Sequence, residues 1–413
     1  MVLHTDVAVV GGRVAGAATA ILLAERGYRV AVIEPDGRSD RVLSTHVFGD
    51  WEAFGRLGVR DAIDRAGAPR VTRFRTEIDG TGLDGDLVVT PHVLALRRER
   101  LDPILGDRAR SLASVDWLEG AIATELVRGD DGAVTGVRAR RGERTIDVHA
   151  QVVVGADGRR SFVARSAGAQ AYLERPRVRC CYYAYYAAAD PAPIPTFEYH
   201  WAGPDLVLAV PCDGDLHCIA VLPPQDDFGR WKGRHEALMA ARLADCGTLS
   251  PRLRDAVRVS AVRGSGSLHS YLRTAYGPGW ALVGDAGAAV HPCIGAGIDH
   301  AAASADLLAR ALDGVLAADE PWTPTMTEYA NGRDALVRPT LEMAVALAGR
   351  GAVDGHDRML LRLVATLPGL GHDLAGGLHE ALARLLGPER MGGIEMLAGS
   401  AAESSVARER VPA

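Results

Sequence analysis

Residues 6–16 read Asp6-Val-Ala-Val-Val-Gly-Gly-Arg-Val-Ala-Gly16 and lead into an Ala/Leu-rich segment that ends at Arg26 and Gly27. A second apolar run, Val30 to Ile33, is followed by Glu34, which lies 23 residues after Gly11. A strand, a glycine turn, a helix and a returning strand make a βαβ unit. In that unit the helix N-terminus faces a phosphate, and the acid at the tip of the second strand accepts hydrogen bonds from ribose hydroxyls. The stretch predicts a dinucleotide-binding fold.

The glycine turn departs from the usual GxGxxG pattern because Arg13 stands at its third position. The glycine usually found there lets the backbone approach a pyrophosphate. Two interpretations remain open: either Gly12 relaxes the turn, or the guanidinium of Arg13 itself meets the phosphates.

Two later segments resemble further strands of the same sheet. Val152-Val-Val-Gly-Ala-Asp157-Gly158 and Trp280-Ala-Leu-Val-Gly-Asp285 each place an aspartate at the tip of a buried strand, and a helical run from Asp299 to Leu312 follows the second. Ligands of open α/β sheets bind at the carboxyl ends of strands. We therefore expect three separated pieces of chain to build one sheet and one site.

A strand-rich region lies between the second and third pieces. Its apolar and aromatic runs cover residues 179–187, 196–201, 206–212 and 216–222, and Asp213-Gly214 between the last two is a hairpin signal. We expect an antiparallel sheet that forms a second domain. After Leu312 the sequence is helical, with interruptions at Pro368-Gly369 and Gly376-Gly377.

Composition narrows the function classes. The chain has 413 residues, 48% of them hydrophobic, and a net charge of −6, so we expect neither nucleic acid nor an anionic membrane as a partner. The six cysteines show no CxxC pair and no zinc-site spacing, so we expect reduced thiols and no metal. There is no secretory signal, and apolar stretches are shorter than a membrane span requires. A soluble, cytoplasmic protein is expected.

With these three motifs in order, the chain resembles the FAD-dependent class A flavoprotein hydroxylases, the single-component monooxygenases with a glutathione-reductase-like FAD fold. The resemblance covers about residues 4–335 and includes Tyr329-x3-Arg333-Asp334. It implies an α/β protein in which a discontinuous, Rossmann-like FAD-binding domain carries an antiparallel substrate domain and C-terminal helices. The predicted boundaries are 1–80, 90–170 and 270–335 for the FAD-binding domain, 171–269 with part of 70–95 for the substrate domain, 336–400 for the helical region and 401–413 for a flexible tail.

The resemblance also assigns cofactor residues. Backbone at the glycine turn would cradle the pyrophosphate, Glu34 would hold the adenosine ribose, and Arg98 would face the phosphates or the ribityl chain unless it is an ordinary solvated helix charge. Asp157 and Gly158 would serve FAD and NAD(P)H together, Asp285 would accept from a ribityl hydroxyl, and the loop before the last helix would lie against the flavin ring. The full set is Gly11, Gly12, Arg13, Ala15, Gly16, Glu34, Arg98, Asp157, Gly158, Asp285, Pro292, Gly295, Ala296 and Gly297.

Two histidines are candidates for the active site. His46 ends the stretch Leu43-Ser-Thr-His46 beyond the second strand; it either touches flavin or substrate, or belongs to a helix-capping loop. His291 precedes the flavin loop. Catalytic roles for side chains are otherwise unassigned, because the flavin carries the chemistry in this family.

The resemblance implies an enzyme that uses NAD(P)H as a transient reductant and O2 to hydroxylate or epoxidise a small, largely apolar, aromatic or polyketide-like metabolite through a flavin C4a-hydroperoxide. Two alternatives remain: an isoprenoid reductase of the geranylgeranyl type, and an FAD protein that catalyses a redox-neutral cyclisation. A flavin halogenase is disfavoured, because Lys232 lies in the wrong domain and no Trp-x-Trp-x-Ile-Pro stretch exists. Tyr183, Tyr185, Tyr199 and Trp201 would line the substrate cavity, or they would only pack the sheet against the FAD-binding domain.

Overall fold

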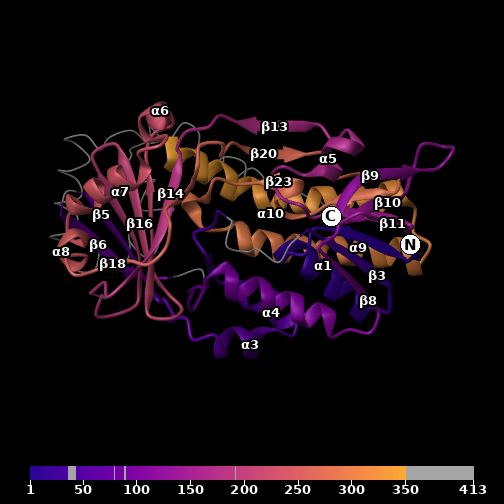
Figure 1. The fold of residues 1–413 in the computed structure, drawn as a ribbon, viewed down its shortest axis with the longest axis horizontal. Helices are drawn as coiled ribbons and strands as arrows, with labels where there is room; N and C mark the ends of the chain where they lie inside the picture. The colour runs from indigo at the N-terminus through magenta and orange to yellow at the C-terminus, as the bar shows by residue number, and fades with distance from the viewer. Residues whose placement is uncertain (36–42, 79, 88–89, 191, 350–413) are drawn as a thin grey trace, which may run out of the picture. The chain divides into compact units, whose positions relative to one another are not determined.

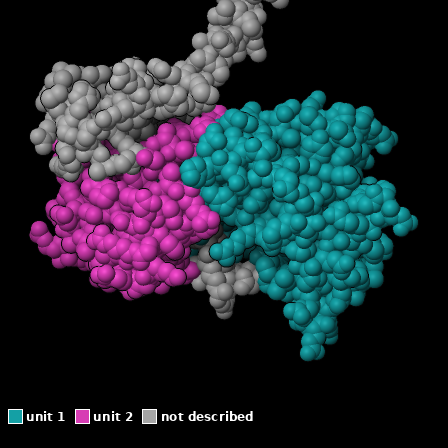
Figure 2. Space-filling model, turned by 90° about the horizontal axis from the view of Figure 1, so that it is seen from above, with its two compact units in different colours: residues 1–68, 95–176, 269–338 teal, residues 69–94, 177–268, 339–413 magenta. Residues whose placement is uncertain are grey.

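The computed structural model describes residues 1–35, 43–78, 80–87, 90–190 and 192–349. The chain forms two compact units, coloured separately in Figure 2. Unit 1 comprises Met1–Ala68, Ala95–Pro176 and His269–Arg338, and unit 2 comprises Pro69–Leu94, Arg177–Leu268 and Pro339–Ala413. Most of the predicted helical region 336–400, and the whole predicted tail 401–413, lie outside the described residues.

The elements of unit 1 follow the predicted order, and Figure 1 labels many of them. Its helices are α1 (Val14–Glu25), α2 (Trp51–Arg56), α3 (Arg60–Arg65), α4 (Arg98–Arg110), α5 (Phe162–Ala167) and α9 (Gly297–Ala317), with 3-10 turns η3 (Gly284–Ala286) and η4 (Pro292–Ile294). Its strands are β1 (Val2–His4), β2 (Val7–Val10), β3 (Val30–Glu34), β4 (Val47–Phe48), β8 (Val115–Glu119), β9 (Ile122–Arg128), β10 (Val134–Arg141), β11 (Arg144–His149), β12 (Val152–Gly155), β13 (Ala171–Arg175), β20 (Ser270–Arg273), β21 (Tyr276–Gly277), β22 (Trp280–Leu282) and β23 (Ala288–Ala289).

The central sheet of unit 1 has the strand order β21-β22-β12-β2-β3-β8, and all its pairs except β21 with β22 are parallel. Its inner strands β2, β3 and β12 are buried along their whole length, as expected for a parallel sheet that is covered on both faces, whereas the edge strand β8 is mostly exposed or half-buried. One face packs on the β9–β11 meander in a single apolar core, and α1 packs against both α4 and α9. The prediction that three separated pieces of chain build one sheet is confirmed.

Unit 2 is built around one large sheet with the order β18-β14-β17-β16-β15-β5-β6, to which β19 adds beside β14. The four strand-rich runs predicted from the sequence pair antiparallel, as expected, whereas β5, which comes from a distant stretch of chain, runs parallel to β15. The remaining pairs are antiparallel, and the hairpin at Asp213-Gly214 joins β16 to β17. The strands are β5 (Arg73–Ile78), β6 (Thr81–Asp86), β14 (Cys181–Ala187), β15 (Thr196–Ala202), β16 (Asp205–Cys212), β17 (Leu216–Leu222), β18 (Val257–Arg258) and β19 (Arg263–Ser265).

Short helices cover one face of this sheet. Tyr182 of β14 stacks on Trp231 with ring centroids 5.0 Å apart, and Met239 and Leu243 join the same apolar core. The helices of unit 2 are η2 (Gln225–Asp227), α6 (Phe228–Trp231), α7 (His235–Ala244) and α8 (Leu249–Arg252).

Two elements lie at the limits between the units in sequence: the short strand β7 (Leu94–Ala95) and the long helix α10 (Trp322–Gly349). Within unit 1, the hydroxyl of Tyr329 on α10 donates to the carbonyl of Leu282 over 2.6 Å, and the buried Arg333 donates to the carbonyl of Arg273 over 2.8 Å. The Tyr-x3-Arg stretch therefore joins α10 to β22 and β20 of unit 1. Among the described helices, none is both long and apolar enough to cross a bilayer.

Candidate functional site

The predicted motifs meet at one edge of the unit 1 sheet. Val10, Ile33, Gly155 and Leu282 stand in one row across β2, β3, β12 and β22, so each motif begins where its strand ends. This edge collects the carboxyl ends of four parallel strands, which is the usual ligand position in such sheets.

Gly11 and Gly16 allow the backbone to pack tightly at this edge. Gly11 has φ +100°, and a Cβ there would lie 2.6 Å from the carbonyl oxygen of Ala156. A Cβ on Gly16 would overlap the carbonyl oxygen of Gly11. Gly284, just before Asp285, likewise packs against Ala15, because a Cβ there would lie 2.8 Å from the Ala15 methyl. The glycine turn, the Asp157 segment and the Asp285 segment are therefore in direct backbone contact.

Glycine at position 12 has a local steric reason. A Cβ at this position would lie 2.5 Å from the Trp117 ring, and the Gly12 amide donates to the Glu34 carboxylate. Arg13 is the N-cap of α1, and no side chain caps that helix. The start of α1 thus has Glu34 beside it and a positive helix end, which is the combination expected at a ribose and a phosphate.

Asp285 is joined to the Asp157-Gly158 motif through Arg159, a residue that the sequence interpretation missed. The Arg159 guanidinium lies 3.4 Å from the Asp285 carboxylate and donates to the carbonyls of His269 and Val290. Tyr271 donates to the backbone carbonyl of Asp285 over 2.6 Å. The carboxylate of Asp285 is 42% exposed, so it is held in place while still open to a ligand.

Among the described residues, the Asp157 carboxylate supports the start of a helix. One of its carboxylate oxygens accepts from the amides of Phe162 and Val163, at the start of α5, where Ser161 also caps the amide of Ala164. Burial raises the pKa of Asp157 above its ordinary value. Gly158 has φ +73°, and a Cβ there would meet nothing within 4 Å, so the neighbouring space is open.

Arg98 is buried at the start of α4, with 8% of its surface exposed, which excludes a solvated helix charge. Its guanidinium forms an ion pair with Asp102 one turn along the helix, with a shortest distance of 2.6 Å. Arg98 and Asp102 therefore form a buried, hydrogen-bonded ion pair inside unit 1.

Two loops, one around Thr45–Val47 and one around Pro292–Gly295, contact each other at this edge. Thr45 donates to the carbonyl of Pro292, and Gly295, at φ +73°, lies against Val47, because a Cβ there would be 3.4 Å from the Val47 Cβ. The chain then turns through Ala296 into α9, which has no capping side chain, and a Cβ at Gly297 would meet nothing within 4 Å. The segment that contains His46 therefore lies on the loop predicted to face the flavin.

The two candidate histidines differ in their surroundings. His46 is 1% exposed and takes φ +64°, a backbone conformation that is uncommon for residues other than glycine. Burial and the charges of Arg98 and Arg97 lower the pKa of His46 to about 3, so its imidazole is neutral at pH 7. Asp50, not His46, caps α2 by accepting from Ala53 over 3.0 Å. His291 accepts from the amide of Cys293 through Nδ1, so it caps η4.

Asp299, in the first turn of α9, was not predicted. Its carboxylate accepts from the amides of Gly49 and Asp50 at 3.0 to 3.1 Å. An aspartate in a first turn is common in any helix, so the sequence alone carries no signal for this contact between residues about 250 positions apart.

The predicted substrate aromatics belong to unit 2. Tyr183 and Tyr199 share one row of the sheet, with Ala220 and Leu208 between them, and all four predicted aromatics are buried. Tyr183 contacts Tyr185 edge-on at 5.9 Å, and the Arg179 guanidinium lies 5.6 Å from the ring centroid of Trp201. The four aromatics lie on the side of the sheet opposite Tyr182, as one pair on β14 and one pair on β15 with β17 and β16 between them.

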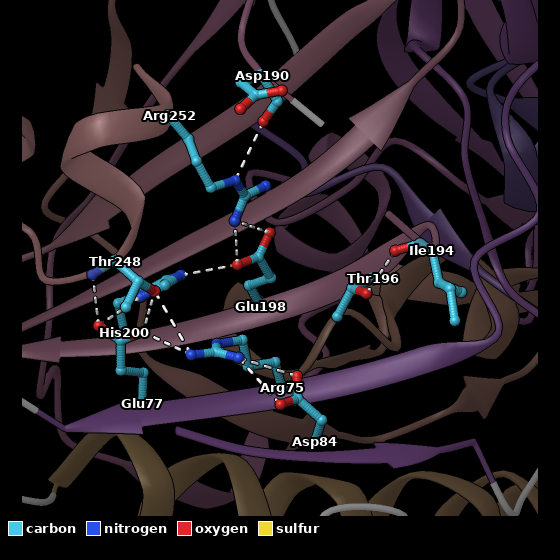
Figure 3. A network of polar contacts seen from close by, with 10 residues as sticks. All are labelled: Arg75, Glu77, Asp84, Asp190, Ile194, Thr196, Glu198, His200, Thr248 and Arg252. Atoms are coloured by element: carbon cyan, nitrogen blue, oxygen red, sulfur yellow. Dashed lines mark hydrogen bonds and ion pairs between the residues drawn. The ribbon is translucent and has the colours of Figure 1, made fainter. Parts of the chain in front are cut away.

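The other side of β15 carries a buried ionic network, which Figure 3 shows. His200 lies between two glutamates, with Nε2 3.1 Å from Glu198 and Nδ1 3.5 Å from Glu77. Arg252 donates to both oxygens of Glu198, at 2.9 and 2.7 Å, and to the carbonyl of Asp190. A pocket of about 90 Å³ beside Glu198 and Arg252 is lined mostly by Pro69, Pro195, Pro211 and His217.

The strand edge of unit 1 fits a dinucleotide cofactor. Both α1 and α9 begin there without a capping side chain, and their positive ends favour a phosphate and an electron-rich ring. Glu34 and the partly exposed Asp285 supply acceptors for sugar or ribityl hydroxyls, and the glycines leave room for the backbone to approach.

Comparisons with known proteins agree with this geometry. A family model described as "FAD binding domain" matches residues 4–338. The chain is 35% identical over 172 residues to "6-methylpretetramide 4-monooxygenase" of Streptomyces rimosus; the match covers 40% of this chain but only 41% of that enzyme. It is 27% identical over 322 residues to "Digeranylgeranylglycerophospholipid reductase 2" of Methanothermobacter thermautotrophicus, covering 73% of this chain and 76% of that protein.

Among solved structures, PqsL of Pseudomonas aeruginosa, described as "a probable FAD-dependent monooxygenase", superposes with a TM-score of 0.71 at 23% identity. That likeness covers 84% of this chain and 96% of PqsL. At such an identity it shows the fold, which is the predicted α/β architecture.

Proposed function

Because the chain belongs to the FAD-binding family of class A flavin monooxygenases, with FAD as its cofactor, we propose that it uses NAD(P)H and O2 to oxygenate a small metabolite. The carrying observation is the 35% identity to 6-methylpretetramide 4-monooxygenase over 172 residues. That relative supports a largely apolar, aromatic or polyketide-like substrate, with hydroxylation or epoxidation as the outcome. The partner is then a small molecule, and the proposed setting is the cytoplasm.

In this proposal unit 1 holds FAD. Backbone amides of the Gly11–Gly16 turn and the start of α1 bind the pyrophosphate, and Glu34 binds the adenosine ribose. Asp285 binds a ribityl hydroxyl, held in position by Arg159, and the buried, paired Arg98 faces the phosphates or the ribityl chain. The domain boundaries proposed from the sequence differ from the two units mainly around residues 69–94, which lie in unit 2.

Bound FAD would accept electrons from NAD(P)H and pass an oxygen atom of O2 to the substrate. The protein's own residues then have three tasks. The uncapped start of α9 at Gly297 would offer a positive helix end to an anionic flavin ring. The Pro292–Gly297 loop, with Thr45 and Val47 against it, excludes water. His46, neutral at pH 7, contributes a hydrogen-bonding group that adds no charge.

The substrate is proposed to contact the four predicted aromatics of unit 2. Tyr183, Tyr185, Tyr199 and Trp201 are buried, and edge-on ring contacts orient Tyr183 against Tyr185 and Tyr199 against Phe197. Such side chains favour planar, apolar ligands over polar ones, which agrees with the substrate class proposed above.

The decisive experiment supplies the purified, FAD-loaded chain with NAD(P)H, candidate aromatic substrates and 18O2. The expected result is substrate-dependent NAD(P)H oxidation and one 18O atom in the product. The matched control is Asp285→Ala, which should purify with little FAD and give neither signal. Product that lacks 18O while NAD(P)H is consumed would overturn the proposal.

One alternative has support of its own. The match to the digeranylgeranylglycerophospholipid reductase spans 73% of this chain, although at 27% identity. A reductase would oxidise NAD(P)H under nitrogen and add hydrogen to an isoprenoid double bond, without O2. Assaying isoprenoid lipids anaerobically alongside the 18O2 experiment separates the two. A flavin that NAD(P)H never bleaches would instead favour the redox-neutral cyclisation.

A further inference from the structure

Two aspartates of α9 hold the region of α2. Asp299, in the first turn, accepts from the amides of Gly49 and Asp50 at 3.0 to 3.1 Å. Asp306, seven residues further along, forms ion pairs with Arg56 at 3.6 Å and Arg310 at 2.8 Å. Of these two aspartates, only Asp299 accepts hydrogen bonds from backbone amides. Those amides lie just after His46 in the chain.

The gripped segment, residues 44–50, is held in a demanding conformation. His46 has φ +64° and is buried, and its amide donates to the hydroxyl of Ser44. A residue other than glycine at such a φ costs free energy, so surrounding contacts must enforce it. Thr45 and Val47, on either side of His46, meet Pro292 and Gly295. The position of His46 and that of the Pro292–Gly295 loop are therefore fixed together.

The Asp299 carboxylate is kept in place at a cost. Burial, with a smaller contribution from the charge of Asp50, raises its pKa to about 6, although the amides of Asp50 and Gly49 offset part of this rise. Because the ordinary pKa is 3.8, folding disfavours the ionised form, and this penalty grows as the pH rises from about 4 to above 6. A buried charge that lowers stability at neutral pH beside a ligand edge points to a functional task.

We propose that Asp299 is a positioning residue: by accepting the Gly49 and Asp50 amides it holds residues 44–50, and with them His46, against the flavin-facing loop at the start of α9. This inference rests on the proposed function, because it takes the Pro292–Gly297 loop to face the flavin. The Asp299 carboxylate holds residues 44–50 through the Gly49 and Asp50 backbone amides.

Hydrogen exchange tests the grip directly in the full chain without FAD. Asp299→Ala should lower protection of the Gly49 and Asp50 amides on the order of tenfold or more, because both lose their acceptor. Asp299→Asn, which keeps one acceptor oxygen, should restore most of the protection. Asp306→Ala is the matched control on the same helix and should leave these two amides as they are. Unchanged protection in Asp299→Ala overturns the proposal.

FAD affinity then tests positioning against simple structural support. Asp299→Ala and His46→Ala should each weaken FAD binding several-fold, and the double variant should be little worse than either alone, because both act through one segment. Fully additive losses would overturn the coupling. At pH 7.5, Asp299→Asn should be at least as stable as the wild type in urea, since it removes the buried charge. A purely structural residue would instead lose stability and FAD binding together.

The outcomes separate the two proposals. If the wild-type chain binds no FAD while Asp299→Ala still loses amide protection, the proposed function fails and the grip stands as a structural fact. If FAD binds equally well to the wild type and to Asp299→Ala despite lost protection, the proposed function stands and positioning by Asp299 is wrong.

Discussion

The strand edge of unit 1 and the ionic network on β15 of unit 2 differ in whether their polar groups are already paired within the protein. At the unit 1 edge, side chains are absent where backbones meet, at Gly11, Gly16 and Gly284, and Asp285 remains partly exposed. Behind β15 in unit 2, charged side chains are buried and paired with one another, with His200 between Glu77 and Glu198 (Figure 3). The first region leaves hydrogen-bond donors and acceptors for a ligand. In the second region the charged groups pair with one another.

This difference predicts how each region responds to substitution. An edge that holds a ligand should lose binding with little loss of stability, unless the backbone itself is pushed apart. A self-satisfied network should lose stability with little loss of binding, because removing one partner leaves the others charged and buried.

The largest effect is expected at the tightest backbone contact. Gly16→Val would drive a side chain into the Gly11 carbonyl, so we expect a loss of more than about 3 kcal/mol in unfolding free energy and no FAD in the purified protein. Urea unfolding and the flavin absorbance measure the two. Gly55→Ala, where a Cβ meets nothing within 4 Å, is the control and should fold normally. A stable, yellow Gly16→Val protein would contradict the packing described for this turn.

Breaking the network should come next. Glu198→Ala leaves Arg252 and His200 without their shared carboxylate, so we expect about 3 kcal/mol of lost stability. FAD affinity should stay within about twofold, because the cofactor edge lies in unit 1. Denaturant unfolding and FAD titration of the same preparation give both values. Equal losses in both would mean that the two regions are coupled.

The network also predicts a pH dependence. Burial disfavours a charged His200, but the carboxylates of Glu198 and Glu77 outweigh it and raise its pKa above 6.5. The stabilisation is thus fully present below pH 6.5 and is lost as the pH rises through the folded-state pKa. His200→Gln should remove this alkaline loss. The check is urea unfolding of both proteins from pH 6 to 9, and parallel curves would exclude the charged imidazole.

The acid side of the same network has the opposite sign. Although burial opposes ionisation of Glu77, hydrogen bonds from His200 and Thr248 lower its pKa to about 2. Its contribution is present above pH 4.5 and is lost as the pH falls toward 2. Glu77→Gln should therefore flatten the acid limb of the stability curve. Circular dichroism across that range would show it, and an unchanged limb would rule out Glu77 as the cause.

Asp285→Ala should affect only the ligand. The carboxylate is 42% exposed and its ion pair with Arg159 spans 3.4 Å, so stability should change by less than about 1 kcal/mol. FAD affinity should fall on the order of tenfold, because a ribityl hydroxyl loses a charged acceptor. Flavin fluorescence during dialysis measures the affinity, and protein that stays fully yellow would contradict this role.

The smallest effect is expected at Arg13, where two interpretations of the turn compete. Glycine is nearly as good an N-cap as most residues, so Arg13→Gly should fold normally and keep its FAD affinity within about threefold. Isothermal titration with FAD decides the matter. A large loss of affinity would make the guanidinium, rather than the backbone, the phosphate ligand.

The sequence predicted the features that depend on local spacing. Gly11, Gly16 and Glu34 lie within one βαβ unit, and the aspartates follow buried apolar runs, so period and offset suffice to place them at one edge. It also predicted the separate sheet of unit 2 and its hairpin. It predicted no direction for β5, because no turn links β5 to β15 and nothing local sets that register.

What the sequence could not provide depends on pairs far apart in the chain. Asp299 meets Gly49, Arg159 meets Asp285, and Arg252 meets Glu198, with separations that range from 54 to 250 residues. Asp285 stands out through its motif, but charged residues in helices and strands are usually solvated, so residue type does not mark Asp299, Glu198 or the two arginines. Only the fold shows which of them are buried against each other.

The strand order of unit 1 has a consequence for how the protein is made. β12 pairs with β2 on one side and with β22 on the other, and the last helix at the cofactor edge, α9, ends at Ala317. Chains emerge from the ribosome N-terminus first, at roughly 5–20 residues per second. The edge of β2 therefore waits for β12, Val152–Gly155, and the other edge of β12 must avoid wrong pairing until β22, Trp280–Leu282, has been made. Because Asp285 and α9 follow β22 in the chain, the strand edge that we propose to hold FAD is complete only after both have been made.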